Sequence, residues 1–338
     1  MQLDIKHNIV SKSLIFQHHY LKWFYWFLLI SISACQSMPV DNKHRVQPAQ
    51  LILEDHILND RIYDVENDRF IDKAQLLSNI SVGKYILLGE THDNIRHHLN
   101  QAWVIDNLAR QTYSTSVSFE MINDTQGIFI ADKDIKTPDD LIDLLNHNKS
   151  SWEYETYYKG LFESVLQAGF RIYPANIERR KLSEIIRQNE SELPTETEQL
   201  MLQVSLTNDM ENSLQEEIIE SHCGMIDQKT AKPMMQGQRI RDATMALSLL
   251  NSDASNNRVL IAGSGHVRKD RGVPMYLSSQ DIEASTIAVS MLEVEQDLVD
   301  VSSYQTRWDA NEFPFDYVWF TARAIREDPC LEFRKKTK

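Results

Sequence analysis

The chain has 338 residues, of which 42% are hydrophobic and 25% are charged, so it is long and apolar enough for a large globular core. Its formal net charge of −14 argues against a nucleic-acid partner, because binding to phosphates requires a basic surface. Cys223 and Cys330 follow a cysteine at position 35. They lie far apart in the sequence and nothing local favours their pairing, so we expect no disulfide.

An apolar run near the N-terminus, residues 23–34, follows a stretch with several lysines and ends at Cys35. The run is shorter than the roughly 20 residues needed to cross a bilayer. Its end, Ile-Ser-Ala-Cys, resembles a bacterial lipobox, in which the cysteine is acylated and becomes the new N-terminus. We therefore predict a lipoprotein signal peptide over residues 1–34, with an uncleaved membrane anchor as the alternative.

Acylation of Cys35 would tether the mature protein to a membrane surface without spanning it. Gln36 follows the cysteine, in place of the aspartate that commonly holds lipoproteins in the inner membrane. We therefore expect the bacterial outer membrane, with the body facing the periplasm or the cell surface. Residues 35–50 are mostly polar and are predicted to be the tether.

From residue 51 onward, short apolar segments alternate with helical patterns. This alternation predicts an α/β fold with a central, mostly parallel sheet flanked by helices. The α/β domain is assigned to residues 51–189 and 236–338. The predicted strands are 85–88, 116–121, 170–174 and 258–262, and the predicted helices are 94–110 and 161–168.

Residues 190–235 interrupt this alternation, because they contain no convincing strand pattern. Leu206, Met210, Leu214 and Ile218 recur every fourth residue, as on one face of a helix. We predict a small all-α domain inserted here, beside the sheet.

Ionisable side chains stand at the ends of three predicted strands. Glu90 and His92 follow strand 85–88, Glu120 ends the second strand, and His266 follows strand 258–262 on a glycine loop. Because parallel strands end at one edge of a sheet, we expect these groups to form a site there. A buried carboxylate beside a histidine is costly unless it is paired, which favours a function.

The segment after His92 has a simpler explanation. Asp93 or Asn94 would cap the next helix. His97 and His98 on that helix are expected at the surface or half-buried.

A crowded aromatic stretch, containing Trp152, Tyr154, Tyr157 and Tyr158, precedes the helix at 161–168. These rings either pack in the core or meet a flat ligand, and tyrosine is a known axial ligand of ferric haem.

Two further residues are candidates for ligand binding. His222 continues the helical stripe of the insertion by one more step of four, as a core residue or a ligand. Arg179 follows strand 170–174, where it could bind the carboxylates of a ligand.

Taken in chain order, these motifs resemble the ChaN-like family of haem-binding uptake lipoproteins in the Tiki superfamily. The resemblance implies a parallel-sheet domain with a small helical domain, a homodimer that encloses haem, and ligation of ferric iron by tyrosine. Tyr158 matches the family's tyrosine, with Tyr157 and Tyr154 as alternatives. The matching segments are Gly89–Asn94, His97-His98, Gln101, Phe119–Met121, Gln126, Trp152, Ala175–Ile177, Gln238–Ala243, Gly263–Val267 and Gly272–Pro274.

The same superfamily contains metal-dependent proteases and esterases. They use equivalents of Glu90, His92, Glu120 and His266, and a glutamate paired with a histidine could activate water directly or through a metal. We therefore expect a lipid-anchored haem-binding protein of haem or iron uptake that requires no catalytic turnover. A hydrolase is the alternative, and a lipid-tethered scaffold without a ligand is the third possibility.

Overall fold

A computed structural model of the chain describes residues 47–111, 114–131, 133–147, 150–187, 193–253, 257–308, 311–328 and 330–331. The predicted signal peptide, the acylated Cys35 and the tether up to residue 46 lie outside the described residues and stay predictions. Within the described ranges, no helix is both long and apolar enough to cross a bilayer.

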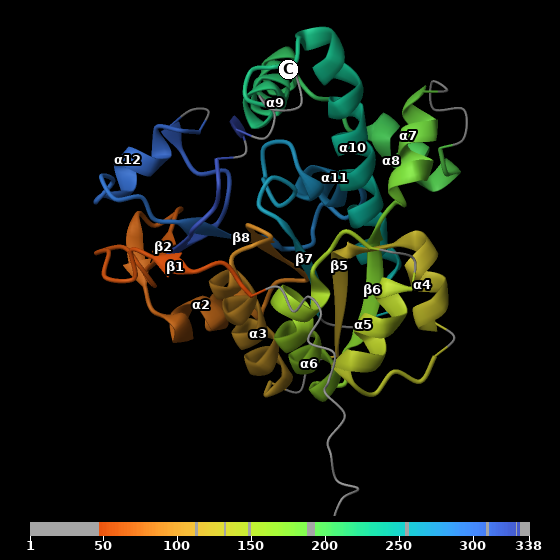
Figure 1. Ribbon diagram of the computed structural model, residues 1–338, viewed down its shortest axis with the longest axis horizontal. Coiled ribbons are helices and arrows are strands. Elements are labelled where there is room, and N and C mark those ends of the chain that lie inside the picture. The colour runs from red at the N-terminus through yellow and green to blue at the C-terminus, as the bar shows by residue number, and fades with distance from the viewer. Residues whose placement is uncertain are drawn as a thin grey trace, which may run out of the picture. The chain divides into compact units, whose positions relative to one another are not determined.

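The centre of the fold is an eight-stranded sheet with the strand order β3-β2-β9-β8-β4-β7-β5-β6 (Figure 1). The six strands from β9 to β6 run parallel, whereas β2 pairs antiparallel with β3 and β9. The predicted α/β fold with a mostly parallel sheet is confirmed. The strands are β2 (Ile62–Asp64), β3 (Arg69–Ile71), β4 (Tyr85–Glu90), β5 (Thr115–Asn123), β6 (Arg171–Asn176), β7 (Asn257–Gly263), β8 (Thr286–Glu293) and β9 (Tyr317–Thr321), with β1 (Leu51–Ile52) and β10 (Arg323–Ala324) as a separate pair.

Helices cover both faces of the sheet, and each helical layer forms its own hydrophobic core (Figure 1). One layer contains α2 (Lys73–Ile80), α3 (Ile95–Ala109), α5 (Pro138–Asn146) and α6 (Lys159–Gln167), and the other contains α7 (Arg179–Arg187), α8 (Thr195–Gln203), α10 (Gln228–Asn251) and α11 (Val273–Gln280). The remaining helices are α4 (Asp124–Ala131), α9 (Asn208–Ser221), α12 (Val301–Gln305) and a π-helical turn, η1 (Tyr154–Tyr158).

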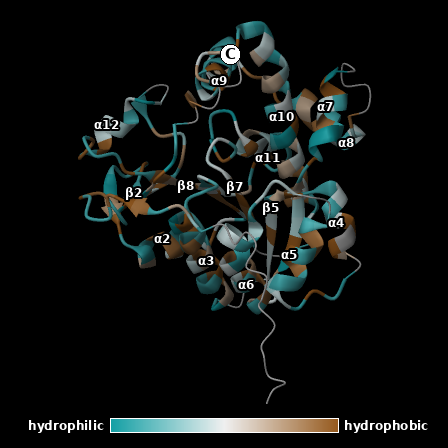
Figure 2. Cartoon of the chain, viewed as in Figure 1, coloured by the Kyte–Doolittle hydropathy of each residue, from teal (hydrophilic) through white to brown (hydrophobic). Residues whose placement is uncertain are grey.

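Strand β4 shows why its sequence is apolar throughout. Its residues alternate between the two cores, with Leu87 in the core that contains α10 and its neighbours Ile86 and Leu88 in the core that contains α3. All residues of β4 are buried. A strand covered on both faces needs a continuous apolar run, and Figure 2 shows hydrophobic residues on the strands between the helical layers.

The predicted insertion at 190–235 is helical where the structure describes it. It holds α8, α9 and the start of α10, which continues beyond it to Asn251. Of the predicted stripe, Leu214 is buried, Met210 and Ile218 are half-buried, and Leu206 precedes the helix. The chain from Val46 to Lys338 forms one compact unit. The insertion as a separate domain stays a prediction.

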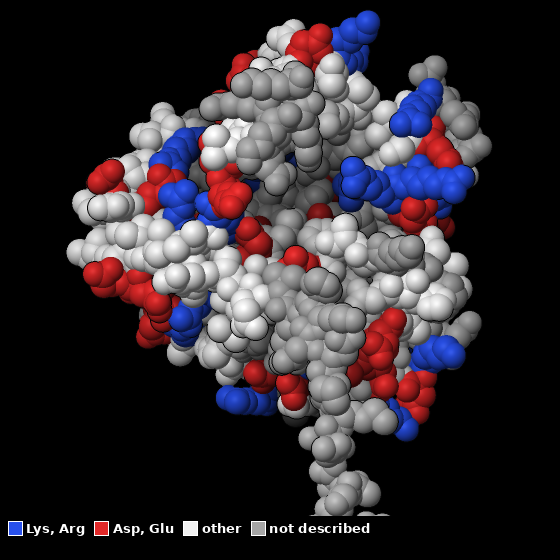
Figure 3. Space-filling view, in the orientation of Figure 1, with Lys and Arg blue, Asp and Glu red and all other residues white. Residues whose placement is uncertain are grey.

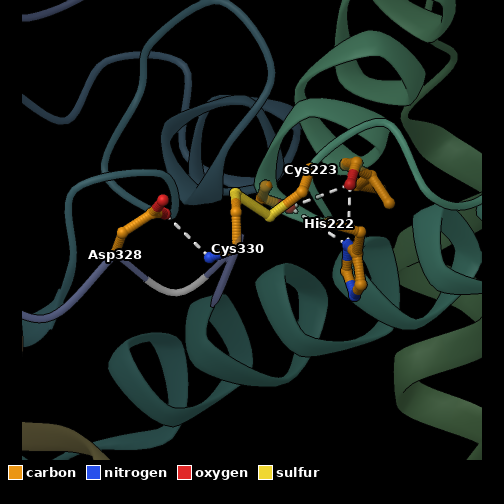
Figure 4. Close-up of a disulfide and its surroundings, with 6 residues drawn as sticks. His222, Cys223, Asp328 and Cys330 are labelled. Carbon is orange, nitrogen blue, oxygen red and sulfur yellow. Dashed lines mark hydrogen bonds between the residues drawn. A yellow bond between two sulfur atoms is a disulfide. The ribbon is translucent and has the colours of Figure 1, made fainter. Parts of the chain in front are cut away.

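A disulfide joins Cys223 to Cys330, which corrects the expectation that these cysteines stay unpaired (Figure 4). Their Cα atoms lie 5.6 Å apart although 107 positions separate them in the sequence. Cys223 follows α9 with a positive φ of 62°, and the C-terminal segment returns to it. The separation of the two cysteines in the sequence did not predict whether they pair, because the fold brings them together in space.

We predict that replacing both cysteines, Cys223→Ser with Cys330→Ser, lowers the free energy of unfolding by about 2–5 kcal/mol. The bond removes conformational entropy from the unfolded chain, and this effect grows with the length of the closed loop. Urea unfolding with a fluorescence readout measures the change. Dithiothreitol should destabilise the wild type by a similar amount and leave the double variant unchanged. Equal stability of the oxidised wild type and the variant would contradict the prediction.

Candidate functional site

The site lies at the carboxyl ends of β4 and β7 and beside Glu120, which follows the last residue of β5 that pairs with β7. Glu90 in β4 pairs in register with Gly263 in β7, and β5 flanks β7 on the other side. The structure therefore brings Glu90, His92, Glu120 and His266 to one edge of the sheet, where the sequence placed them. The edge is the carboxyl end of the parallel strands, the usual location of sites in open α/β sheets.

Glu90 is a buried carboxylate with three partners. Tyr158 donates its hydroxyl proton to Oε1 at 2.6 Å, and His92 donates from Nδ1 to the same oxygen at 2.9 Å. His98 Nδ1 lies 3.2 Å from Oε2. Burial alone would raise the pKa of Glu90, but the charge of His98 and the bonds from both histidines hold this pKa well below its usual value. Glu90 is therefore an anion.

His98 carries the compensating charge. Its Nε2 faces the carbonyl oxygen of His92 at 3.0 Å, while its Nδ1 faces Glu90 and the amide oxygen of Gln101. Both ring nitrogens meet acceptors, so both must carry a proton. Burial lowers the pKa of His98, but the charge of Glu90 and the hydrogen bonds of the ring together raise it by more than burial lowers it. The pKa of His98 therefore lies above its ordinary value. Glu90 and His98 form a buried ion pair.

The burial of both helix histidines corrects the expectation that His97 and His98 lie at the surface or half-buried. Asn94 caps α3 as predicted, accepting from the Arg96 backbone N–H. His97 Nδ1 then accepts from the Thr91 N–H at 2.8 Å. Burial lowers the pKa of His97 to about 3, so it stays neutral beside its cationic neighbour. The apolar periodicity of α3 did not predict the burial of His97 and His98, because hydrogen bonds and ion pairs with buried groups stabilise these side chains in the interior.

A second group of charges surrounds Glu120. Its Oε2 accepts from the Gly263 N–H at 2.7 Å, and its Oε1 lies 3.4 Å from His266 Nε2. His266 Nδ1 donates to Asp242 at 2.5 Å. Burial would lower the pKa of His266, but Glu120 and Asp242 raise it to about 10. Although burial opposes it, the charges of His266 and His92 lower the pKa of Glu120 to about 2.

Sequence reasoning missed Asp242 as a site residue. It lies on α10, where Ala243 and Ala246 are also buried, and is itself 2% exposed. An acid at a buried position of a helix is costly unless it has a partner. Its place among apolar residues of the helix could therefore have indicated that Asp242 pairs with another site residue.

His92 connects the two groups. Its Nε2 lies 3.9 Å from Glu120, while its Nδ1 contacts Glu90, and its ring packs edge-on against Trp152 at 4.8 Å. A Cβ at Gly263 would sit 3.1 Å from His92 Nε2, so a side chain there would crowd the ring. We call the resulting series of alternating acids and histidines the charge row: Asp242, His266, Glu120, His92, Glu90 and His98.

The charge row is better suited to holding protons than to exchanging them near neutral pH. A general base works best with a pKa near the operating pH, and His266 with a pKa of about 10 keeps its proton there. Among the described residues, no group of three or more histidine, cysteine and acidic side chains is arranged to hold a metal ion.

The candidate tyrosines lie in three different settings. Tyr154 is in the core and donates to the carbonyl oxygen of Met121 at 2.6 Å. Tyr158 is 1% exposed and donates to Glu90. Tyr157 is half-buried, and its hydroxyl oxygen accepts from the Ala49 N–H at 3.3 Å.

The other two candidates lie outside the charge row. Arg179 begins α7 and lines a cavity that also includes Glu120 and Trp152. His222 lies at the end of α9, next to the disulfide and not on a strand end, with its Nδ1 donating to Ile218 (Figure 4).

We predict that His266→Gln destabilises the protein most below pH 6.5. The pKa of His266 rises from 6.5 to about 10 on folding, so its contribution is complete below pH 6.5 and is lost as the pH rises toward 10. Removing one partner from a buried charge group costs about 3–5 kcal/mol. Urea unfolding at pH 6 and pH 9.5 should therefore show a larger difference between wild type and variant at pH 6.

The exposed His147 in α5's C-terminal turn provides the control, because His147→Gln removes a histidine outside the charge row. It should change the free energy of unfolding equally little at both pH values. A His266→Gln effect that is the same at pH 6 and pH 9.5 would refute the charged state assigned to His266.

Solved structures with the same fold include ChaN of Campylobacter jejuni with cofacial haem, at 22% identity over 78% of this chain and 97% of that chain, with a TM-score of 0.61. The type III effector HopBA1 is more distant, with 11% identity over 73% of this chain and 91% of the other and a TM-score of 0.40. A mutant of the erythromycin esterase EreC in its open conformation has 11% identity over 78% and 82%, with a TM-score of 0.38.

No curated protein sequence matches this chain. A family profile does match, described as haem-binding uptake, Tiki superfamily, ChaN, and it covers residues 76–277. The match contains the charge row, the aromatic segment and the strands that carry them, and it spans more than half of the chain. The chain therefore belongs to the ChaN family of haem-binding uptake proteins.

Proposed function

We propose that this protein binds haem and contributes to haem or iron uptake as a lipid-anchored homodimer at the outer membrane. The family match over residues 76–277 carries the proposal. The shared fold with ChaN of Campylobacter jejuni, solved with cofacial haem, supports it. The lipobox-like sequence ending at Cys35 supports the lipid anchor.

A tyrosine ligand would supply a phenolate oxygen to ferric iron. Tyr158 does not fit this role in the conformation described, because its hydroxyl donates to Glu90. Burial first, and then the charge of Glu90, raise the pKa of Tyr158 well above its usual value. Tyr154 is no better placed, since its hydroxyl bonds to the backbone in the core.

Tyr157 fits better because its side chain is half-buried, whereas Tyr154 and Tyr158 are each 1% exposed, so a ligand could reach Tyr157 from the surface. Burial raises its pKa, while the hydrogen bond from Ala49 lowers it. Its ring lies beside His98, with the centroids 5.9 Å apart. The geometry therefore favours Tyr157 over Tyr158 as the haem ligand.

We predict that Tyr157→Phe weakens hemin binding about tenfold or more, a change equivalent to 1.4 kcal/mol. The full-length chain in mild detergent is titrated with hemin, absorbance reports the iron ligand, and size-exclusion chromatography reports dimer formation. Tyr154→Phe is the matched control and should leave the spectrum unchanged, because that ring lies in the core.

Two results would count against this proposal. An intact spectrum after all three tyrosines become phenylalanine would rule out tyrosine ligation. A titration that does not saturate would rule out haem as the ligand.

A hydrolase is the second candidate, and one observation favours it. Glu120 lines the cavity, and Nε2 of the half-exposed His92 lies 3.9 Å from its carboxylate. A water molecule in the cavity could therefore meet a carboxylate that has a histidine beside it, and such a pair can perform acid–base chemistry.

Glu120→Gln separates the two candidates. A hydrolase would lose turnover of an ester or amide with this variant while hemin binding persists. A screen of ester and amide substrates on the wild type that gives no turnover would remove the second candidate.

A further inference from the structure

A polar cavity of about 720 Å³ opens beside the charge row, at the ends of β5 and β6. Three of its lining residues are apolar, namely Met121, Trp152 and Ile177. The other lining residues are polar or charged and include Glu120, Asn176, Glu178, Arg179 and Arg241. Sites for flat apolar ligands are lined mainly by hydrophobic and aromatic groups, so this lining suits a small polar ligand better than a porphyrin ring.

Arg241, from α10, brings a positive charge to the cavity, which favours an anionic ligand. Its Nη1 donates to the Asn176 side-chain oxygen at 2.9 Å. An arginine has five N–H donors, and no acid in the described part of the chain lies within ion-pairing distance of this one. Burial lowers its pKa, and nearby Arg179 adds to this effect against the opposing charges of Glu120 and Asp242. Arg241 is half-buried, so a cation without an ion-pair partner here is only partly solvated by water.

Arg179, from the start of α7, brings a second cation to the same cavity. The structure shows no ion pair between its guanidinium and an acid of the described residues. The acids nearby are already engaged. Glu120 binds His266 and the Gly263 N–H, and Glu178 accepts from the first backbone N–H groups of α7.

Lys181 shows the contrast on the same helix, because its ammonium pairs with Asp124 at 2.9 Å. Figure 3 shows lysine and arginine side chains gathered near α7. Two guanidinium groups that form no ion pair among the described residues therefore line one cavity. Glu120 and Glu178 line it too, but their carboxylates are engaged by His266 and by backbone N–H groups, so an anion could bind to the two arginines.

We propose that this cavity binds a carboxylate or phosphate group of a small molecule between Arg179 and Arg241. Guanidinium groups bind such oxygens through paired hydrogen bonds. Asn176 holds Arg241 in place, since its amide also donates to the Glu120 carbonyl oxygen at 2.9 Å. The anion has two sources, a free small anion or a propionate of haem whose ring stays outside. The site does not depend on haem binding, because the free anion needs no porphyrin.

The first test is isothermal titration of the full-length chain in detergent with citrate and with pyrophosphate, at constant ionic strength. We expect saturable binding of at least one anion and a loss of about tenfold or more in affinity with Arg179→Gln, which removes one of the two cations. Arg179 is exposed, so this variant should fold normally.

Arg180→Gln is the matched control. Arg180 is the next residue of the same helix, but it pairs with Glu184 and does not line the cavity. The control should bind the anions like the wild type. Equal losses in Arg179→Gln and Arg180→Gln would indicate general surface charge and overturn the site.

Hemin and its dimethyl ester distinguish the two sources. If a propionate occupies the site, the wild type should bind hemin more tightly than the ester, and Arg179→Gln should abolish that difference. If a free anion occupies it, citrate or pyrophosphate binds and both porphyrins bind equally. The proposal is overturned if neither small anion binds saturably and Arg179→Gln leaves the preference for hemin over its ester unchanged.

Discussion

The carboxylate of Glu90 is the constraint around which this edge of the sheet is arranged. It ends the central strand β4, where all residues are buried, so it has no water to solvate its charge. His98 supplies a positive charge from α3, and Tyr158 and His92 supply hydrogen bonds. An uncompensated buried charge costs several kcal/mol, and α3, η1 and the loop between β4 and α3 each supply one partner to this acid.

The same requirement extends across the neighbouring strands. Glu120 ends up beside His266, and Asp242 reaches His266 from α10 on the other helical layer. Acids and histidines alternate, so each charge has neighbours of opposite sign. This arrangement explains a site rich in ionisable groups whose protons are tightly held. Of the charge row, only Glu120 also lines the neighbouring cavity.

In the described part of the chain, the cationic groups of the cavity beside the charge row are not paired in this way. Its two arginines form no ion pair with an acid of the described residues, whereas every member of the charge row has a partner of opposite charge. The paired charges of the charge row indicate a structural network, whereas the two arginines of the cavity are the basis of the proposed anion site. The two proposed ligands would use different residues, because the Tyr157 ring packs beside His98 while Arg179 lines the cavity.

Sequence alone determined the parallel sheet, because strands covered on both faces must be apolar throughout, and it placed Glu90, Glu120 and His266 at strand ends. The motifs in the sequence indicated the ChaN family, and the family profile confirms it. Only the tertiary structure decided the partners: the buried state of His98, the part played by Asp242, and the bond between Cys223 and Cys330. Local periodicity reports which face of an element is buried. It cannot report which distant charge or thiol makes that burial stable, because this depends on how the elements pack.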